Sequence, residues 1–471
     1  MSSRDNHYQG APLPAQSVIT RTITVASGPF APGHLGELTQ IVPFDMVDEI
    51  LAETRTVQTR VRDLPSRVVV YLLLAGCLFA DLGYGQVWHR LTSGLDGLDT
   101  ATPTTGALCQ ARRRIGVAPL RALFDLLRGP AAGIASTGVR WRGLLVTAID
   151  GTTMTVADST ANLTVFTNPG SHNGGSGYPL MRMLVLVCCG TRTVLNTVFG
   201  PATSGETTYA AQLLGGVRED TIVLADRNFA VADLVSTIAA TGAHVLFRVK
   251  AGRKLPTLRR HDDGSYLSTM GGIPVRVIDA EITITTGAGK RTGGYRLVTT
   301  LLDHHRHPAF GLVGLYHERW EIETAFLEVK STILGGRVLR ARTPTGVTQE
   351  IYALLVTYQI LRLAMADATD TRPGTDPDRA SFTIALHAAR DLLVQAAGVI
   401  ADTVIDLVGA IGRLVLANLL PDRRVRLNPR TVKRAISKYN ARGIVDRTSY
   451  KATISIDILA LPTPLTTKPD H

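Results

Sequence analysis

The segment 315–334 reads LYHERWEIETAFLEVKSTIL. It contains no Gly or Pro and is rich in Glu and Leu, which predicts a helix. At about 100° per residue, four polar side chains fall within roughly 60° of arc on one face of that helix. They are Tyr316, Arg319, Glu323 and Lys330. Taken alone, such a face is more typical of a solvated helix with i,i+4 ion pairs than of a site.

The composition indicates a globular protein with a basic surface. A hydrophobic content of 45% and a charged content of 19% are typical of a chain with a substantial core, and 471 residues allow two to four domains. The net charge of +11 favours a polyanionic partner, nucleic acid before membrane. The four cysteines have no C-x-x-C spacing, and an adjacent pair indicates buried thiols in a reducing cytosol.

No segment predicts secretion or membrane insertion. The N-terminus is polar and lacks the apolar centre of a signal peptide. The longest early apolar run, 68–80, is 13 residues long, which is too short to cross a bilayer. Charged residues interrupt the later apolar stretches at 351–365 and 392–420. We therefore expect no membrane partner.

The first third of the chain predicts helices. Residues 1–30 are rich in Pro, Gly, Ser and Thr and are expected to form a flexible tail. Residues 31–140 show a helical pattern, with Ser66 as the expected N-cap of one helix, and are interpreted as a DNA-binding domain. Within it, 103–128 predicts two helices separated by a turn at Gly116, the first carrying three arginines. That pair is either a helix-turn-helix-like DNA module or an ordinary helical hairpin.

From Trp141 the pattern changes to strands. The order strand, hairpin, helix, strand, helix, strand predicts an α/β, ribonuclease-H-like core whose first and fourth strands lie side by side. The expected strands are 144–152, 181–190, 192–200, 221–230 and 243–250. Asp150 and Asp226 lie at the carboxyl ends of the first and fourth strands, so their carboxylates are expected to come together.

The remaining segments complete the predicted organisation. The core comprises 141–250 and 312–370, interrupted at 251–311 by a β insertion of several short strands with basic loops. Residues 371–471 are expected to be a helical C-terminal region, with a basic run at 423–451 that we interpret as contacting phosphates. The histidines between 304 and 307 are interpreted as part of a surface loop rather than a zinc site.

Three carboxylates combine into a candidate metal site. Asp150, Asp226 and Glu323 lie on the expected strands and helix in the order that lets them converge at one edge of the sheet. Grouped carboxylates repel one another unless cations neutralise them, and hard oxygen ligands suit Mg²⁺ or Mn²⁺. Two such ions activate an attacking water or 3′-hydroxyl and stabilise the leaving oxygen in phosphoryl transfer. Asp150-Gly151 alone would be compatible with a simple turn.

These residues resemble the DDE transposases of the insertion-sequence-4 family. Asp150-Gly151-Thr152 resembles the first family signature, and Asp226-Arg227-Asn228-Phe229 is similar to its D-R-x-F motif. Tyr316, Arg319, Glu323 and Lys330 match the third signature, Tyr-x2-Arg-x3-Glu-x6-Lys, without a gap. The similarity covers about 35–365 and, more weakly, 429–440.

The resemblance implies cut-and-paste DNA transposition by a cytoplasmic, nucleoid-associated bacterial protein. Such a protein binds double-stranded DNA at terminal inverted repeats and at the target, and forms a dimeric synaptic complex. By matching positions, Asp150, Asp226 and Glu323 would ligate Mg²⁺, with Mn²⁺ as a substitute. The DNA-contacting residues would be Tyr316, Arg319, Lys330, Arg227, Arg248, Lys250 and two aromatic platforms for a flipped base, Trp320 and Tyr295. Ordinary packing is the alternative for both aromatic side chains.

Two other functions remain open at this point. A stand-alone structure-specific nuclease or resolvase would use the same sheet, but the helical N-terminal region, the β insertion and the third signature argue against it. An inert or domesticated copy that only binds DNA is the other alternative, and the intact acids at 150, 226 and 323 argue against that.

Overall fold

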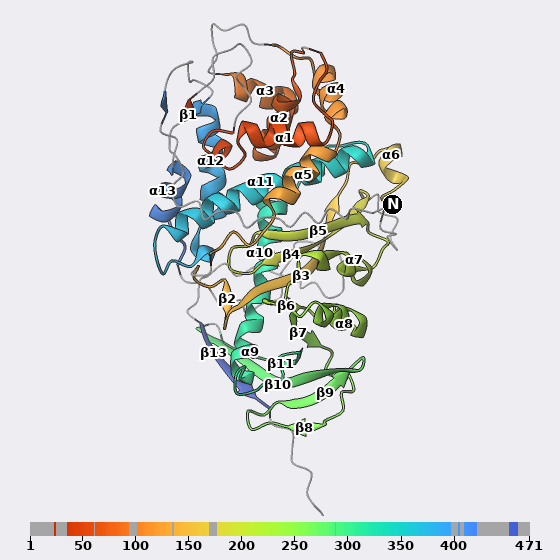
Figure 1. Ribbon diagram of the computed structural model, residues 1–471, viewed down its shortest axis with the longest axis vertical. Helices are drawn as coiled ribbons and strands as arrows, with labels where there is room; N and C mark the ends of the chain where they lie inside the picture. Colours follow the sequence, from red (N-terminus) through yellow and green to blue (C-terminus); the bar gives the residue numbers. More distant parts are fainter. Residues whose placement is uncertain are drawn as a thin grey trace, which may run out of the picture. The chain divides into compact units, whose positions relative to one another are not determined.

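A computed structural model describes residues 23–24, 35–60, 62–93, 101–133, 136–168, 177–287, 289–396, 404–405, 409–421 and 452–459 (Figure 1). The chain divides into two compact units. Unit 1 comprises Met1–Arg140, Gly151–Gly205 and Glu321–Leu420, and unit 2 comprises Trp141–Asp150, Glu206–Trp320 and Pro421–His471.

Unit 1 is mainly helical, and its core gathers around the long helix α11 (Pro344–Asp370). This helix packs against α2, α5, α12 and α13 (Figure 1). The other helices of the unit, apart from the segment that ends at Ile333, are η1 (Leu38–Gln40), α1 (Phe44–Glu53), α2 (Ser66–Leu78), α3 (Tyr84–Thr92), α4 (Thr105–Ile115), α5 (Ala118–Leu127), α6 (Thr160–Leu163), η5 (Pro377–Arg379), α12 (Phe382–Ala396) and α13 (Ala410–Ala417).

Within the described ranges, α11 is the one helix long and apolar enough to cross a membrane, by length and composition. However, 78% of its most apolar window is buried inside the protein. Arg362, on the same helix, is fully buried and bonded to Glu328. Burial on all sides explains the apolar composition of α11, because a helix at the centre of a core is hydrophobic all round.

The predicted helix pair at 103–128 is confirmed as α4 and α5. Gly116 ends α4 with a positive φ of 65°, a conformation that glycine adopts without strain. Two of the arginines on α4 contact other segments of unit 1. The Arg112 guanidinium lies 4.2 Å from the ring centroid of Tyr84, and Arg114 donates a hydrogen bond to the carbonyl of Leu64. These contacts leave both interpretations of the pair open.

The expected N-cap at Ser66 is wrong. Ser66 is the first residue of α2, and Pro65 occupies the cap position without a side-chain hydrogen bond. The Ser66 hydroxyl instead donates to the carbonyl of Thr56, while the Gln58 side chain accepts the Ser66 N–H. The orphan donor at this helix end is thus satisfied by a residue from the preceding loop.

The predicted ribonuclease-H-like strand order is confirmed. The sheet order begins β5–β4–β3–β6–β7, so the first core strand lies beside the fourth. β3 pairs with β6, and β6 with β7, in parallel, while β4 and β5 form the expected antiparallel hairpin. Their bounds are β3 (Leu144–Thr155), β4 (Leu180–Cys188), β5 (Val194–Pro201), β6 (Thr221–Ala225) and β7 (His244–Val249). In unit 2, α7 (Glu206–Leu213) and η2 (Leu214–Gly216) precede β6, and α8 (Ala232–Ala240) links β6 to β7.

The segment expected as a β insertion extends the sheet of unit 2. Its strands are β8 (Arg259–Arg260), β9 (Tyr266–Met270), β10 (Ile273–Thr286) and β11 (Gly289–Thr299). β11 pairs with β7 directly, and β10 and β11 are 14 and 11 residues long, so these two strands are not short. A hairpin of this length is stabilised by its own ladder and by continuity with the core sheet.

The C-terminal region is not wholly helical, because β13 (Ala452–Ile458) pairs antiparallel with β10. The predicted basic run at 423–451, including 429–440, lies outside the described residues, as does most of the predicted tail at 1–30. Two short pairings complete the strands: β1 (Ile23–Thr24) with β12 (Val404–Ile405), and β2 (Arg140–Trp141) with β3.

The stretch 315–334 is helical, but it is not one regular α-helix. It comprises the end of α9 (Ala309–Tyr316), a 3₁₀ turn η3 (His317–Arg319), α10 (Trp320–Leu327) and a π-helical segment η4 (Glu328–Ile333). The Leu334 N–H donates to the carbonyl of Val329, five residues back, as in a π-helix. The simple angular arithmetic therefore holds only approximately beyond Leu327.

Candidate active site

Asp150 and Asp226 follow the last paired residues of two neighbouring parallel strands. The β3–β6 pairing ends with Ile149 opposite Ala225, and each aspartate is the next residue in the chain. β6 ends there, whereas β3 continues to Thr155, so the prediction that Asp150 ends its strand is wrong. The β-branched residues that follow Asp150 favour the extended conformation and explain the longer strand.

The D-R-x-F motif forms a fixed turn after β6. Asp226 Oδ1 accepts a hydrogen bond of 2.8 Å from the Asn228 N–H, and the Asp226 carbonyl accepts from Phe229. Phe229 is fully buried, so its ring anchors the turn in the core of unit 2. Arg227 is exposed on the same turn. The motif thus holds one carboxylate in place and leaves one cation accessible to solvent.

Two residues of the third signature contact the same strand ends within unit 2. The Arg319 guanidinium lies 3.4 Å from Asp150 Oδ2, with side chains 10% and 21% exposed. The Tyr316 hydroxyl donates to the carbonyl of Ala225, the residue before Asp226, at 3.2 Å. Burial raises the pKa of the Tyr316 phenol above its ordinary value, so the hydroxyl stays protonated and remains a donor.

Lys330 contacts β3 within unit 1. Its Nζ donates to Thr152 Oγ1 at 3.0 Å and to the carbonyl of Thr153 at 2.7 Å. Glu323, half-buried on α10, lies between Arg319 and Lys330 in the sequence. That the four polar residues of the signature share one face stays a prediction.

The donor set suits a hard divalent cation. Asp150 and Asp226 directly follow the last paired residues of two neighbouring strands. Their side chains supply carboxylate oxygens, the ligand type that Mg²⁺ and Mn²⁺ prefer. Across the ranges that the structure describes, no three His, Cys, Asp or Glu side chains are grouped so that they could hold a metal ion. The carboxylates of Asp150 and Asp226 are chemically suited to such a cation, and the convergence of Glu323 with them stays a prediction.

The remaining predicted DNA-contacting residues divide into packed and exposed groups. The Arg248 guanidinium lies 4.2 Å from the ring centroid of Tyr295, and that ring meets Tyr316 edge-on at 6.3 Å. The Arg319 guanidinium similarly lies 5.0 Å from the ring centroid of Trp320. Lys250, like Arg227, is exposed. The structure thus gathers Arg248, Tyr295 and Tyr316 into one cluster, whereas the role of each stays a prediction.

The histidine-rich segment is partly buried. The rings of His261 and His304 stack with their centroids 4.2 Å apart, and the rings of His304 and His305 are tilted, with centroids 3.9 Å apart. His307 is buried, and its ring lies 5.7 Å from that of Trp141. The interpretation as a surface loop is therefore wrong for His307. No periodic pattern in the sequence around His307 indicates that this side chain is buried.

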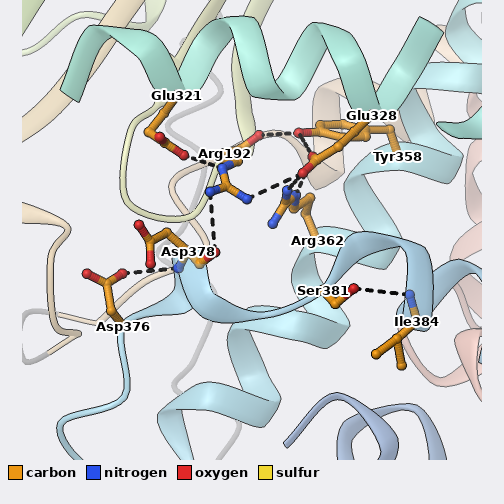
Figure 2. A network of polar contacts seen from close by, with 9 residues as sticks. All are labelled: Arg192, Glu321, Glu328, Tyr358, Arg362, Asp376, Asp378, Ser381 and Ile384. Carbon is orange, nitrogen blue, oxygen red and sulfur yellow. Dashed lines mark hydrogen bonds and ion pairs between the residues drawn. The ribbon is translucent and has the colours of Figure 1, made fainter. Parts of the chain in front are cut away.

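A buried network of charges in unit 1 was not predicted from the sequence (Figure 2). Arg192 forms ion pairs with Glu321 and Glu328, and Arg362 pairs with Glu328 as well. The Tyr358 hydroxyl lies 2.8 Å from the Arg192 carbonyl and 3.2 Å from Glu328 Oε2. One signal was available: Glu321 and Glu328 are spaced by seven residues, as are Glu323 and Lys330.

Comparison with known proteins gives two family matches. The family described as insertion element 4 transposase N-terminal matches residues 32–125, and the family described as transposase DDE domain matches residues 141–360. The chain is 25% identical over 407 residues to the transposase InsG for insertion sequence element IS4 of Escherichia coli (strain K12), covering 84% of this chain and 91% of that protein. It is 27% identical over 208 residues to the putative transposase InsZ of the same strain, covering 43% and 67%.

Among solved structures, a cryo-EM structure of the piggyBac transposase synaptic complex with hairpin DNA is similar with a TM-score of 0.45. The sequence identity is 12%, and the alignment covers 86% of this chain and 87% of that one.

Proposed function

Since this chain belongs to the insertion element 4 family of DDE transposases, we propose that it moves its own insertion sequence by metal-dependent cleavage and strand transfer of DNA. The observation that carries the mechanism is the pairing of β3 with β6. It brings Asp150 and Asp226 to adjacent positions, with Arg319 and Tyr316 of the third signature against the same strand ends.

The three acidic residues of the signatures are the proposed metal ligands. Transposases with this domain generally use divalent metal ions, and Asp150, Asp226 and Glu323 would hold Mg²⁺, or Mn²⁺ in its place. When bound, these ions would activate the attacking water or 3′-hydroxyl and stabilise the leaving oxygen. The positive charge of Arg319 compensates the negative charge of Asp150. A guanidinium can also bind a phosphate through two parallel hydrogen bonds, as a bidentate donor.

The cationic and aromatic residues around this position are the proposed DNA contacts. Tyr316, Arg319 and Lys330 would hold phosphates of the cleaved strand, which fix the register of DNA without reading its sequence. Arg227 and Lys250, both exposed, would contact the backbone further away. Arg248 with Tyr295, and Trp320, would offer faces on which a flipped base stacks.

The proposed partners follow from this chemistry. The net charge of +11 favours double-stranded DNA, here the terminal inverted repeats and the target. Two copies of the chain would synapse the two ends as a homodimer, in the bacterial cytoplasm at the nucleoid.

The test is strand cleavage of a duplex that carries the inverted repeat flanking the gene, in Mg²⁺, with wild type and Glu323→Gln. The substitution keeps the size and hydrogen bonding of the side chain and removes the charge that a metal needs. We expect wild type to nick at the repeat boundary and the variant to bind the duplex without cutting. If both proteins bind and neither cuts, an inert DNA-binding copy becomes the better account. Equal cutting by both would show that Glu323 is not a metal ligand.

A further inference from the structure

Arg192 is held rigidly in the loop between β4 and β5. Its φ is +58°, a left-handed conformation that is unfavourable for a residue with a Cβ. The backbone is fixed there on both sides, because the Arg192 N–H donates to the Cys188 carbonyl and the Arg192 carbonyl accepts from the Tyr358 hydroxyl. The guanidinium therefore projects from a well-defined point in the core of unit 1.

The guanidinium bridges two turns of the helical segment that carries Glu323. Arg192 donates through Nε to Glu321 and through Nη1 to Glu328 at 3.3 Å, and both carboxylates are buried (Figure 2). Seven helical residues rise about 10 Å and complete roughly two turns, so Glu321 and Glu328 lie near one face. Glu328 is the first residue of the π-helical segment.

Glu323 and Lys330 repeat the same spacing on another face. Each lies two residues beyond its buried counterpart, which is roughly 200° around the helix. The contacts agree with this separation, because Lys330 bonds to Thr152 and Thr153 of β3 and not to Arg192. One face of the helical segment is thus anchored through carboxylates, and the other presents the signature residues.

The charges of the network balance within the protein interior. Two buried carboxylates face two buried guanidinium groups, Arg192 and Arg362. Burial by itself would lower the pKa of Arg192, but the carboxylates of Glu321 and Glu328 outweigh it and raise that pKa. Removal of one partner would leave an uncompensated buried charge, which is costly.

We propose that Arg192 is a positioning residue for Glu323 and Lys330. Its bonds to Glu321 and Glu328 set the rotation of α10 and of the π-helical segment about their axis, and with it the direction in which the signature side chains point. This inference rests on the proposed function of Glu323 as a metal ligand. A pure stability role would leave the metal requirement of the protein unchanged.

The test compares Glu321→Gln with a matched control, Glu350→Gln. Both glutamates are buried in unit 1, but the Glu350 carboxylate accepts from the N–H groups of Arg340 and Ala341 and not from Arg192. The measured quantities are the Mg²⁺ concentration that gives half-maximal nicking, the Kd for repeat DNA and the urea midpoint. We expect Glu321→Gln to raise the Mg²⁺ requirement about tenfold, as the loss of residues that orient metal ligands does, with the Kd nearly unchanged. Glu350→Gln should lower the urea midpoint without changing the Mg²⁺ requirement.

A double variant tests whether Arg192 acts through Glu321. Arg192→Lys keeps the charge but replaces the separate Nε and Nη1 donors with a single ammonium, which does not reproduce both bonds in their geometry, so it should also raise the Mg²⁺ requirement. The combination of Arg192→Lys with Glu321→Gln should be no worse than the more impaired single variant. Multiplied effects, or an equal shift in Glu350→Gln, would overturn the proposal.

Failure of the proposed function gives a different result. If the folded wild type does not nick repeat DNA at all, the enzymatic proposal fails. Anchoring is then decided by hydrogen exchange of the amides in 320–334. Exchange at least tenfold faster in Glu321→Gln than in Glu350→Gln supports the anchoring role, and equal exchange refutes it.

Discussion

Replacement of Lys330 by Met should show how much this residue contributes to the free energy of unfolding. Its ammonium donates to Thr152 Oγ1 and to the Thr153 carbonyl, so Met would remove both hydrogen bonds while keeping an unbranched apolar chain. A hydrogen bond from a charged group contributes about 1.5–3 kcal/mol. Because Lys330 is only half-buried and solvent competes, we expect the free energy of unfolding to fall by about 2 kcal/mol in total.

A double-mutant cycle separates this contact from other effects of the substitution. Thr152→Val keeps the shape of the side chain and removes the acceptor, which should cost about 1 kcal/mol in wild type. In the Lys330→Met background the same change should cost almost nothing, giving a coupling energy of about 1 kcal/mol. The assay is urea unfolding followed by tryptophan fluorescence, with repeat-DNA binding measured in parallel. Additive effects, or a Lys330→Met variant as stable as wild type, would refute the contact.

Three further predictions concern other parts of the two units. A Cβ at Gly190 would lie 2.8 Å from the Gly138 carbonyl oxygen and from Val139 Cα, so Gly190→Ala should lower the unfolding free energy by about 1–3 kcal/mol in a urea titration. Tyr316→Phe loses the bond to the Ala225 carbonyl and should cost about 1 kcal/mol in the same assay; an unchanged midpoint would exclude that bond. Burial is the main cause that lowers the pKa of His307, and the positive charge of Arg306 lowers it further. The His307 ring therefore binds a proton less readily in the folded state than in the unfolded state. The free energy of unfolding is not reduced by this group above the ordinary pKa of about 6.5, and it falls as the pH drops below that value. The His307→Gln variant should therefore lose less unfolding free energy than wild type between about pH 7.5 and pH 5.5.

The core of the fold was accessible to sequence analysis because its signals are local. Apolar runs of strand length, the turn residues between them and the intervening helical segments predict the order of β3 to β7. That order alone places Asp150 beside Asp226. The spacing of the third signature then identifies Tyr316 and Arg319, which the structure finds against the same two strand ends.

The remaining features depend on contacts between distant segments. The pairing of β13 with β10 joins two parts of the chain whose patterns do not indicate each other. Arg192 is expected to begin the strand 192–200 but precedes β5, and its partners come from a helical segment 129 and 136 residues later. The π-helical segment after Leu327 likewise has no Gly or Pro to mark it.

The central claim is that Asp150 and Asp226, with Glu323, hold the metal ions of DNA cleavage. The most direct measurement is the number of Mn²⁺ ions bound per chain in the complex with repeat DNA, determined by electron paramagnetic resonance. We predict about two ions for wild type and fewer for Asp226→Asn, with DNA binding retained. Equal Mn²⁺ binding by both proteins would contradict the claim, as would cleavage by a wild type that binds none.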